Sequence, residues 1–178
     1  MREDIVNKST LNITKGNNKQ MKEEPLVKGW VTVIKNPGRP DEQVLCKNKP
    51  NLLTNAGRDW MIAQVYTNTS AGTRGSGYIA LTANSTSPAA GDTSLAAEIT
   101  SGGLARADAT TKSHTGGTNS TTIQHTFTAS ATHTNVQKSG LFNNTKDNSD
   151  TMSHENVFTA VTLQSSDTLQ VTWTTTLG

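Results

Sequence analysis

Residues 157–174 read Val-Phe-Thr-Ala-Val-Thr-Leu-Gln-Ser-Ser-Asp-Thr-Leu-Gln-Val-Thr-Trp-Thr, and this stretch decides the fold class. On each side of the polar residues 164–167 lies a run in which the two faces of an extended chain alternate from residue to residue. Before that turn, one face of an extended chain carries Val157, Thr159, Val161 and Leu163; after it, one face carries Leu169, Val171 and Trp173. Alternation with a period of two is typical of half-buried strands, and a polar turn between two such runs predicts an antiparallel hairpin.

The same signals recur toward the N-terminus. Residues 121–130 alternate, residues 78–82 form a short apolar run, and residues 30–46 predict a hairpin around the turn residues 36–41. Residues 104–112 and 136–142 add two further strands, and residues 55–66, capped by Thr54 or Asn55, predict one short helix. About eight or nine short strands with regular turns predict an all-β protein, an antiparallel β-sandwich of jelly-roll or Ig-like type.

The predicted core of this sandwich is thin. Leu, Ile, Val and Phe make up roughly 18% of the 178 residues, whereas about 30 residues are threonine. A chain this polar gains little from burial alone, so we expect it to associate with its own copies or with another surface. The candidate core residues are Trp30, Val33, Trp60, Ile79, Leu81, Phe127, Phe158, Val161, Leu169, Val171 and Trp173.

Charge divides the chain into two parts. Residues 1–60 hold about 11 of the 16 Lys and Arg residues and about 7 of the 14 Asp and Glu residues. We expect residues 1–28 to form an extended N-terminal arm and residues 29–178 to form the β-sandwich body. The arm residues expected to bind a partner are Ile5, Val6, Lys8, Leu11, Ile13, Lys15, Lys19 and Lys22. Because these lysines alternate with acidic residues and lack neighbouring aromatic side chains, a protein-bound arm is favoured over a nucleic-acid contact.

Several classes of function lack the residues that they need. The one cysteine, Cys46, allows neither a disulfide within the chain nor a cysteine-based zinc cluster. No apolar run approaches the length of about 20 residues that spans a bilayer, and the N-terminus has no secretory signal, so we expect synthesis in a cytosol and no membrane partner. The histidines His114, His125, His133 and His154 accompany no serine-nucleophile motif. We therefore expect no catalytic site, no metal site and no cofactor.

Five segments, in this order, resemble small virion proteins of tailed bacteriophages. The first, residues 51–60, reads Asn-Leu-Leu-Thr-Asn-Ala-Gly-Arg-Asp-Trp. The others are residues 78–82, residues 92–106 with Asp92, Leu95, Glu98 and Arg106, residues 139–142, and residues 167–173. The resemblance covers about residues 29–178 and leaves the arm out.

The resemblance implies a virion structural protein without a catalytic motif. One expectation is a capsid decoration (cement) protein, located on the virion, that binds the major capsid protein on the outer surface of an icosahedral head and forms a homo-oligomer, a trimer. The alternative is a tail-fibre or tail-associated module that binds host glycans. An enzyme that cleaves polysaccharides on the same sandwich would need two acidic residues in one cleft, which the sequence alone does not reveal.

Overall fold

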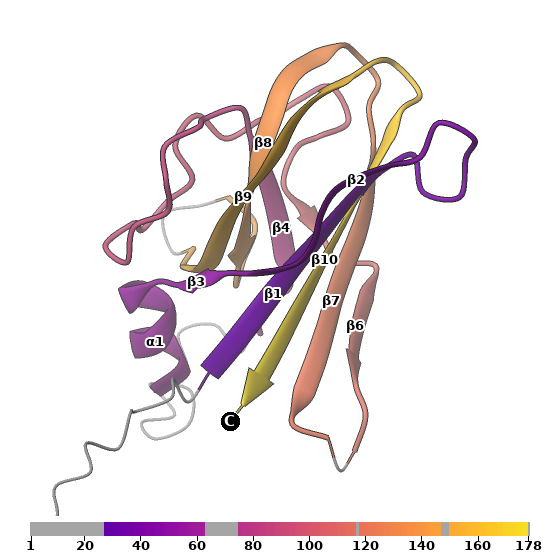
Figure 1. Ribbon diagram of the computed structural model, residues 1–178. Helices are drawn as coiled ribbons and strands as arrows, with labels where there is room; N and C mark the ends of the chain where they lie inside the picture. Colours follow the sequence, from indigo (N-terminus) through magenta and orange to yellow (C-terminus); the bar gives the residue numbers. More distant parts are fainter. Residues whose placement is uncertain (1–26, 63–74, 117, 147–149, 178) are drawn as a thin grey trace, which may run out of the picture.

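The computed structural model describes residues 27–62, 75–116, 118–146 and 150–177, which form two antiparallel sheets of five strands each (Figure 1). Sheet A contains, in spatial order, β2 (Gln43–Pro50), β1 (Val27–Lys35), β10 (Thr168–Leu177), β7 (Ser120–Thr128) and β6 (Thr111–His114). Sheet B contains β3 (Leu52–Leu53), β9 (Met152–Leu163), β8 (His133–Phe142), β4 (Tyr78–Thr82) and β5 (Ala107–Asp108). The prediction of an all-β sandwich is therefore confirmed.

The main core lies between the two sheets. From sheet A it takes residues such as Val31, Val171 and Trp173, and from sheet B residues such as Ile79 and Leu81, each with no exposed side-chain surface. Nine of the candidate core residues lie in this cluster: Val33, Ile79, Leu81, Phe127, Phe158, Val161, Leu169, Val171 and Trp173. Trp60 lies outside the residues whose side chains the structure describes.

The hairpin predicted over residues 157–173 is wrong, although both of its strands exist. β9 belongs to sheet B and β10 to sheet A, so the turn at residues 164–167 carries the chain from one sheet to the other. Leu163 and Leu169, on either side of the turn, both point into the main core. A hairpin and a crossing between sheets have the same alternating pattern, so the pattern predicts strands but not their partners.

β9 also breaks the expected alternation. Its pairing with β8 shifts register between the pairs Val136–Val161 and Lys138–Val157, so β9 uses extra residues over this stretch. Phe158 and Val161 are buried as a result, whereas Thr159 is exposed. The prediction that Thr159 shares the core face is wrong because a bulge reverses the faces of the strand beyond it.

Two other segments differ from their predicted bounds. The strand expected at residues 104–112 is split between β5 in sheet B and β6 in sheet A, so it too crosses the sandwich. β1 begins at Val27 and pairs along its whole length with β10, so residues 27 and 28 belong to sheet A rather than to the arm. The hairpin of β1 and β2 is confirmed.

The helix α1 (Asn55–Ile62) packs against β9. Thr54 caps it, because its Oγ1 accepts a hydrogen bond of 3.0 Å from the Gly57 N–H. A Cβ atom on Gly57 would lie 2.5 Å from the Ser153 carbonyl oxygen, so only glycine lets the helix approach so closely. The rest of the helix predicted over residues 55–66 lies outside the described residues.

Sheet B is covered on its outer face as well as on its inner one. A second apolar cluster there contains Ala80, Leu95, Phe142 and Met152, with Tyr78 packed against it. Leu95 comes from the long irregular chain between β4 and β5, which thus packs on this face. The outer face of sheet A has no comparable cluster among the described residues.

Candidate functional site

The outer face of sheet A is almost free of charge. Even-numbered positions of its three central strands face away from the core, since odd-numbered residues such as Val31, Val171 and Phe127 are buried. The outward positions are Lys28, Trp30, Thr32, Ile34, Ser120, Thr122, Gln124, Thr126, Thr128, Thr168, Gln170, Thr172, Thr174 and Thr176. Lys28, near the end of the sheet, is the single charged residue among them, and threonine fills most of the rest. We call this set the threonine face.

Side-chain hydrogen bonds link neighbouring strands across the threonine face. Gln124 Nε2 donates to Thr172 Oγ1 at 2.8 Å, and Gln170 Nε2 donates to Thr126 Oγ1 at 3.3 Å. The polar groups are thus partly satisfied within the sheet, which lowers the cost of removing this face from water.

Trp30 lies on this face, and its assignment to the core is wrong. The side chain is half-buried and lines a shallow hollow together with Asn48 and Thr174. Ile34 lies four residues further along β1 on the same face, and the neighbouring Val44 is 51% exposed. Apolar residues occur on both faces of β1, so the sequence did not show which face met the core.

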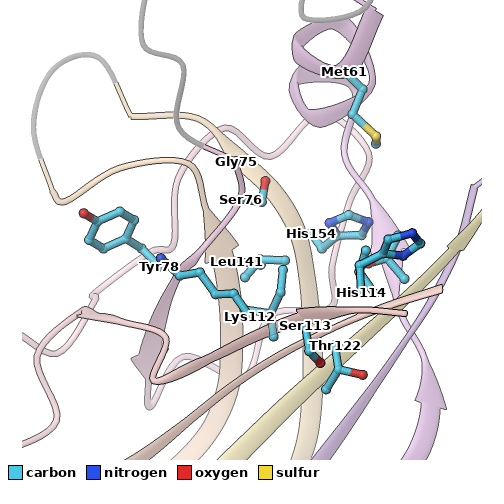
Figure 2. A pocket seen from close by; sticks show the side chains of 13 residues that line it. Met61, Gly75, Ser76, Tyr78, Lys112, Ser113, His114, Thr122, Leu141 and His154 are labelled. Atoms are coloured by element: carbon cyan, nitrogen blue, oxygen red, sulfur yellow. The ribbon is translucent and has the colours of Figure 1, made fainter. Parts of the chain in front are cut away.

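A cavity of about 650 Å³ opens between the sheets near α1 (Figure 2). Its walls combine apolar and hydroxyl side chains with the Lys112 ammonium and the imidazoles of His114 and His154, and they come from α1, from both sheets and from the chain just before β4. The lining includes Met61, Ser76, Ile123, Leu141, His154 and Thr175.

His154 lies at the wall of this cavity, and one of its ring nitrogens is buried without a partner among the described residues. Its side chain is 3% exposed, and its Nε2 has no hydrogen-bond partner in the described part of the chain. The Ser153 hydroxyl donates to the Leu141 carbonyl at 3.0 Å, so the Ser153 oxygen is left to accept from His154 Nδ1–H at 3.1 Å and from the Ser76 hydroxyl at 2.9 Å. Because the Ser153 oxygen accepts from the His154 ring, the ring proton lies on Nδ1. Nε2 is therefore a hydrogen-bond acceptor that has no donor in the described part of the chain.

The structure places the four histidines on four different strands, β6 to β9. His114 lines the same cavity as His154, and its Nδ1–H donates to the Ser120 carbonyl at 2.9 Å. His125 lies edge-on to Phe127, with ring centres 4.6 Å apart, and burial lowers its pKa. His133 Nε2 lies 3.1 Å from the Gly102 carbonyl oxygen.

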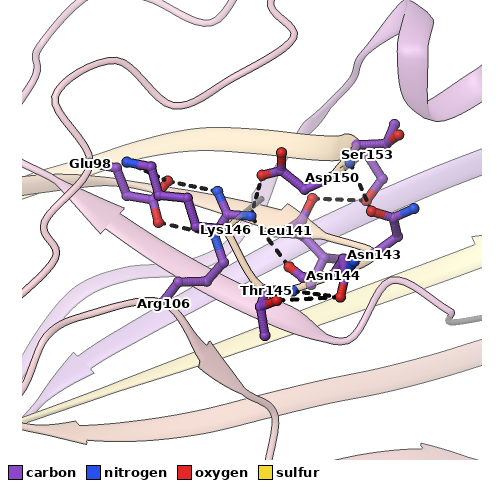
Figure 3. Close-up of polar contacts among 10 residues, drawn as sticks. Glu98, Arg106, Leu141, Asn143, Asn144, Thr145, Lys146, Asp150 and Ser153 are labelled. Atoms are coloured by element: carbon purple, nitrogen blue, oxygen red, sulfur yellow. Dashed lines mark hydrogen bonds and ion pairs between the residues drawn. The ribbon is translucent and has the colours of Figure 1, made fainter. Parts of the chain in front are cut away.

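A buried ion network fastens the long chain between β4 and β5 to the connection between β8 and β9 (Figure 3). The Arg106 side chain is 4% exposed and donates to both Glu98 carboxylate oxygens, at 3.0 and 2.7 Å. It also pairs with Asp150 and lies over the Phe142 ring, 3.6 Å from its centre. These carboxylates raise the Arg106 pKa against the effect of burial.

A second buried pair joins Lys138 and Glu155 on the outer face of sheet B. Their charged atoms are 3.3 Å apart, and the side chains are 4% and 1% exposed. The Ala89 N–H donates to both Glu155 and Asp92, so these two carboxyl groups meet under the same loop. Burial, assisted by the hydrogen bond with Asp92, raises the pKa of Glu155 to about 7, whereas that hydrogen bond lowers the pKa of Asp92.

His154 and Glu155 make opposite contributions to the pH dependence of stability. Burial lowers the pKa of His154 from 6.5 to about 4, so its contribution to the free energy of unfolding is lost as pH falls through this window. The pKa of Glu155 is raised from 4.5 to about 7, so the folded state holds the extra proton and stability is lost as pH rises through that window. Between pH 4.5 and 6.5 the two slopes oppose each other.

We therefore expect urea unfolding to separate the two groups. The free energy of unfolding should fall with rising pH in His154→Gln and rise with pH in Glu155→Gln, each by at most about 1.4 kcal/mol per pH unit. The parent protein should show a much flatter profile between pH 4.5 and 6.5. Parallel profiles for all three proteins would contradict these assignments.

The candidate arm residues, Ile5, Val6, Lys8, Leu11, Ile13, Lys15, Lys19 and Lys22, lie outside the described residues. Within the described ranges, no three His, Cys, Asp or Glu side chains gather in a way that could hold a metal ion. No helix in that part of the chain has the length and apolar character needed to cross a membrane. Comparison with family models, with curated proteins and with solved structures gave no match.

Proposed function

We propose that this protein is a virion structural protein, a capsid decoration (cement) protein that binds the outer surface of an icosahedral phage head as a homo-oligomer, a trimer. The observation that carries the proposal is the nearly uncharged threonine face on sheet A. Cores of protein interfaces are depleted in charged residues, and aromatic residues are enriched there. The threonine face, with Trp30, fits that description.

In this proposal the two parts of the chain have different partners. The threonine face contacts neighbouring copies, and the arm lies across major capsid protein subunits. Each contact is weak, but an oligomer binds through several arms at once, so the effective concentration of each further arm is high. Copies that bind only the assembled shell stabilise it by mass action.

Copy number per particle tests the proposal. Quantitative mass spectrometry of purified virions, with the major capsid protein as internal reference, should find the protein in a fixed ratio to the shell protein, as a lattice component requires. A small fixed number of copies per virion would assign the protein to the tail instead of the head. Its absence from virions would refute both locations.

A charge placed at the centre of the threonine face tests the oligomer contact. Thr172 pairs with Thr32 on one side and with Gln124 on the other. We expect Thr172→Lys to weaken self-association by about 2–5 kcal/mol per contact, because the ammonium group would be buried without a partner. Light scattering coupled to size-exclusion chromatography measures the mass. Thr159→Lys, at an exposed position of β9 in sheet B, is the matched control. Equal masses for both variants would contradict the assignment.

The position of Trp30 favours a second candidate, a tail-associated module that binds host glycans. A half-buried indole beside Asn48 and Thr174 offers a ring for stacking and polar groups for hydroxyls. If this candidate is right, a soluble host oligosaccharide should change the fluorescence of the parent protein, and Trp30→Ala should lose both the response and the binding. A decoration protein should show no response.

A further inference from the structure

We propose that Lys138 and Asp92 become joined by an amide bond within the folded chain, with Glu155 as the acid and base that carries the protons. The bond ties the loop between β4 and β5 covalently to β8. This modification goes beyond the proposed function and does not depend on it, because it needs only the folded subunit. A failed copy-number measurement therefore leaves it untouched.

Lys138 is a buried amine held against a buried acid. Its side chain is 4% exposed, and its Nζ lies 3.3 Å from Oε2 of Glu155, whose side chain is 1% exposed. The two residues lie diagonally across β8 and β9, since Lys138 pairs with Val157 and Glu155 pairs with Gly140. The sheet thus fixes the amine beside the acid, which supplies the proximity that an amide-forming reaction needs.

Asp92 reaches the same place from the loop. The Ala89 N–H donates to Asp92 Oδ2 at 2.9 Å and to Glu155 Oε1 at 3.2 Å. Asp92 also shares a hydrogen bond with Glu155, and the charge of Lys138 acts on both acids. Within the described ranges, Lys138 and Asp92 are the charged groups that act on Glu155. Glu155 therefore contacts both partners of the proposed bond, which is where a proton relay must lie.

Glu155 first prepares both partners. Its pKa is raised to about 7 by burial and by its hydrogen bond with Asp92, whose own pKa is lowered. Below pH 7 the proton of this pair therefore lies on Glu155, and Asp92 is ionised. Glu155 passes that proton to Asp92 and accepts one from the Lys138 ammonium. A neutral amine, which is nucleophilic, then lies beside a neutral carboxyl group, which can accept it.

The bond-forming step releases one water. Lys138 Nζ forms a bond to Asp92 Cγ, and the Ala89 N–H donates to the oxygen that becomes negative as the amine adds. Glu155 moves a proton from the nitrogen to the Asp92 hydroxyl, the bond between Cγ and that hydroxyl breaks, and water leaves. Glu155 ends protonated, as it began, so no other reactant is needed.

Apolar side chains keep water from this part of sheet B. Gly140, opposite Glu155, has Phe142 and Met152 within contact distance of its Cβ position. Leu95, from the same loop as Asp92, packs on that pair. A site closed to water protects the amide from hydrolysis once it has formed. A bond between residues so far apart in the sequence also restricts the unfolded chain, which stabilises a fold with a thin core.

The intact mass of the full-length chain tests the bond. After incubation of the folded protein at neutral pH, the parent should be lighter than its sequence mass by one water. Lys138→Arg and Asp92→Ala should keep their full masses. Lys112→Arg and Asp108→Ala alter an exposed ion pair and, as matched controls, should lose the water as the parent does. A parent chain with the full sequence mass would overturn the proposal.

Tryptic mapping identifies the two bonded residues. Trypsin cuts after lysine and arginine, so an unlinked chain gives residues 75–106, 113–138 and 139–146 as separate peptides. It does not cut after an acylated lysine, so the linked chain should give residues 113–146 uncut and joined to residues 75–106. A join to residues 147–178 would overturn the roles assigned to the two acids. Loss of water without any join would overturn the bond itself.

The rate of bond formation tests the role of Glu155. Chains made by cell-free synthesis are quenched in acid at successive times, and mass spectrometry gives the linked fraction. Glu155→Gln should slow the reaction at least about 100-fold, the lower end of what general acid–base catalysis contributes. Glu155→Asp keeps a carboxyl group and should recover part of the rate, which a purely structural role does not explain. Equal rates in the parent and in Glu155→Gln would refute the relay.

Discussion

Replacing Arg106 with methionine is expected to lower the free energy of unfolding by about 3–5 kcal/mol. The guanidinium holds two carboxylates, and Glu98 is 2% exposed. Without Arg106, the cation left near Glu98 in the described part of the chain is Lys146 Nζ at 3.9 Å, on a side chain that is 55% exposed. Most of the loss in stability comes from leaving the Glu98 carboxylate buried with so distant a partner, and less comes from losing the ion pair itself. A domain of this size is stable by only about 5–15 kcal/mol, so the loss is a large share of the total.

Urea unfolding with three comparison variants checks this expectation. Lys112→Met removes an exposed ion pair with Asp108 and should change stability by less than about 1 kcal/mol. Arg106→Lys keeps the charge but loses the two-pronged contact with Glu98, so it should fall between the two. Adding Glu98→Leu to Arg106→Met should recover part of the loss. A loss below 1 kcal/mol in Arg106→Met would contradict the role assigned to the network.

Gly103→Ala is expected to cost about 2–5 kcal/mol, which adds overpacking to backbone strain. Gly103 has a φ of 79°, in the region that favours glycine, and a Cβ atom there would lie 2.0 Å from the Thr128 carbonyl oxygen. That oxygen belongs to the backbone at the end of β7, so it cannot move aside without disturbing sheet A.

Variants at two other glycines separate the cost of backbone strain from the cost of overpacking. Gly38 has a φ of 74° but no atom within 4 Å of its Cβ position, so Gly38→Ala should show the strain alone, about 1 kcal/mol. Gly91 has neither feature, and Gly91→Ala should be within about 0.5 kcal/mol of the parent protein. Thermal unfolding of the three variants gives the order. Equal losses at positions 38 and 103 would show that the contact with Thr128 is not a constraint.

Alternation along the chain predicted most strands but not the sheets to which they belong. The period of two predicted β7 to within two residues at each end and predicted β10 up to residue 174, three residues short of its end, because each strand has one face in the main core and one outside it. The same period could not reveal that residues 164–167 cross between sheets. The bulge in β9 left no mark in the composition of residues 157–163, and it put Phe158 rather than Thr159 in the core, whereas Val161 and Leu163 are buried as expected.

The candidate surfaces were harder to predict than the fold. Trp30 looked like a core residue because apolar residues lie on both faces of β1, and only the burial of Val31 and Val33 in the structure shows which face is inward. The cavity brings together His154 and His114 from strands of different sheets, a proximity that depends on the topology rather than on spacing. The spacing of Glu98, Asp150 and Glu155 along the sequence did not show that these acidic residues hold buried cations.

The neighbouring positions of β1 and β10 have a consequence for the order of folding. β10 is the latest strand in the chain, but it lies in the middle of sheet A, between β1 and β7. Until it is synthesised, β1 and β7 have no common neighbour, and each exposes an unpaired edge. Pairing over so long a sequence separation is slow. Nascent chains on neighbouring ribosomes can meanwhile exchange strands, so the yield of native subunits should depend on how fast the last residues of β10 emerge.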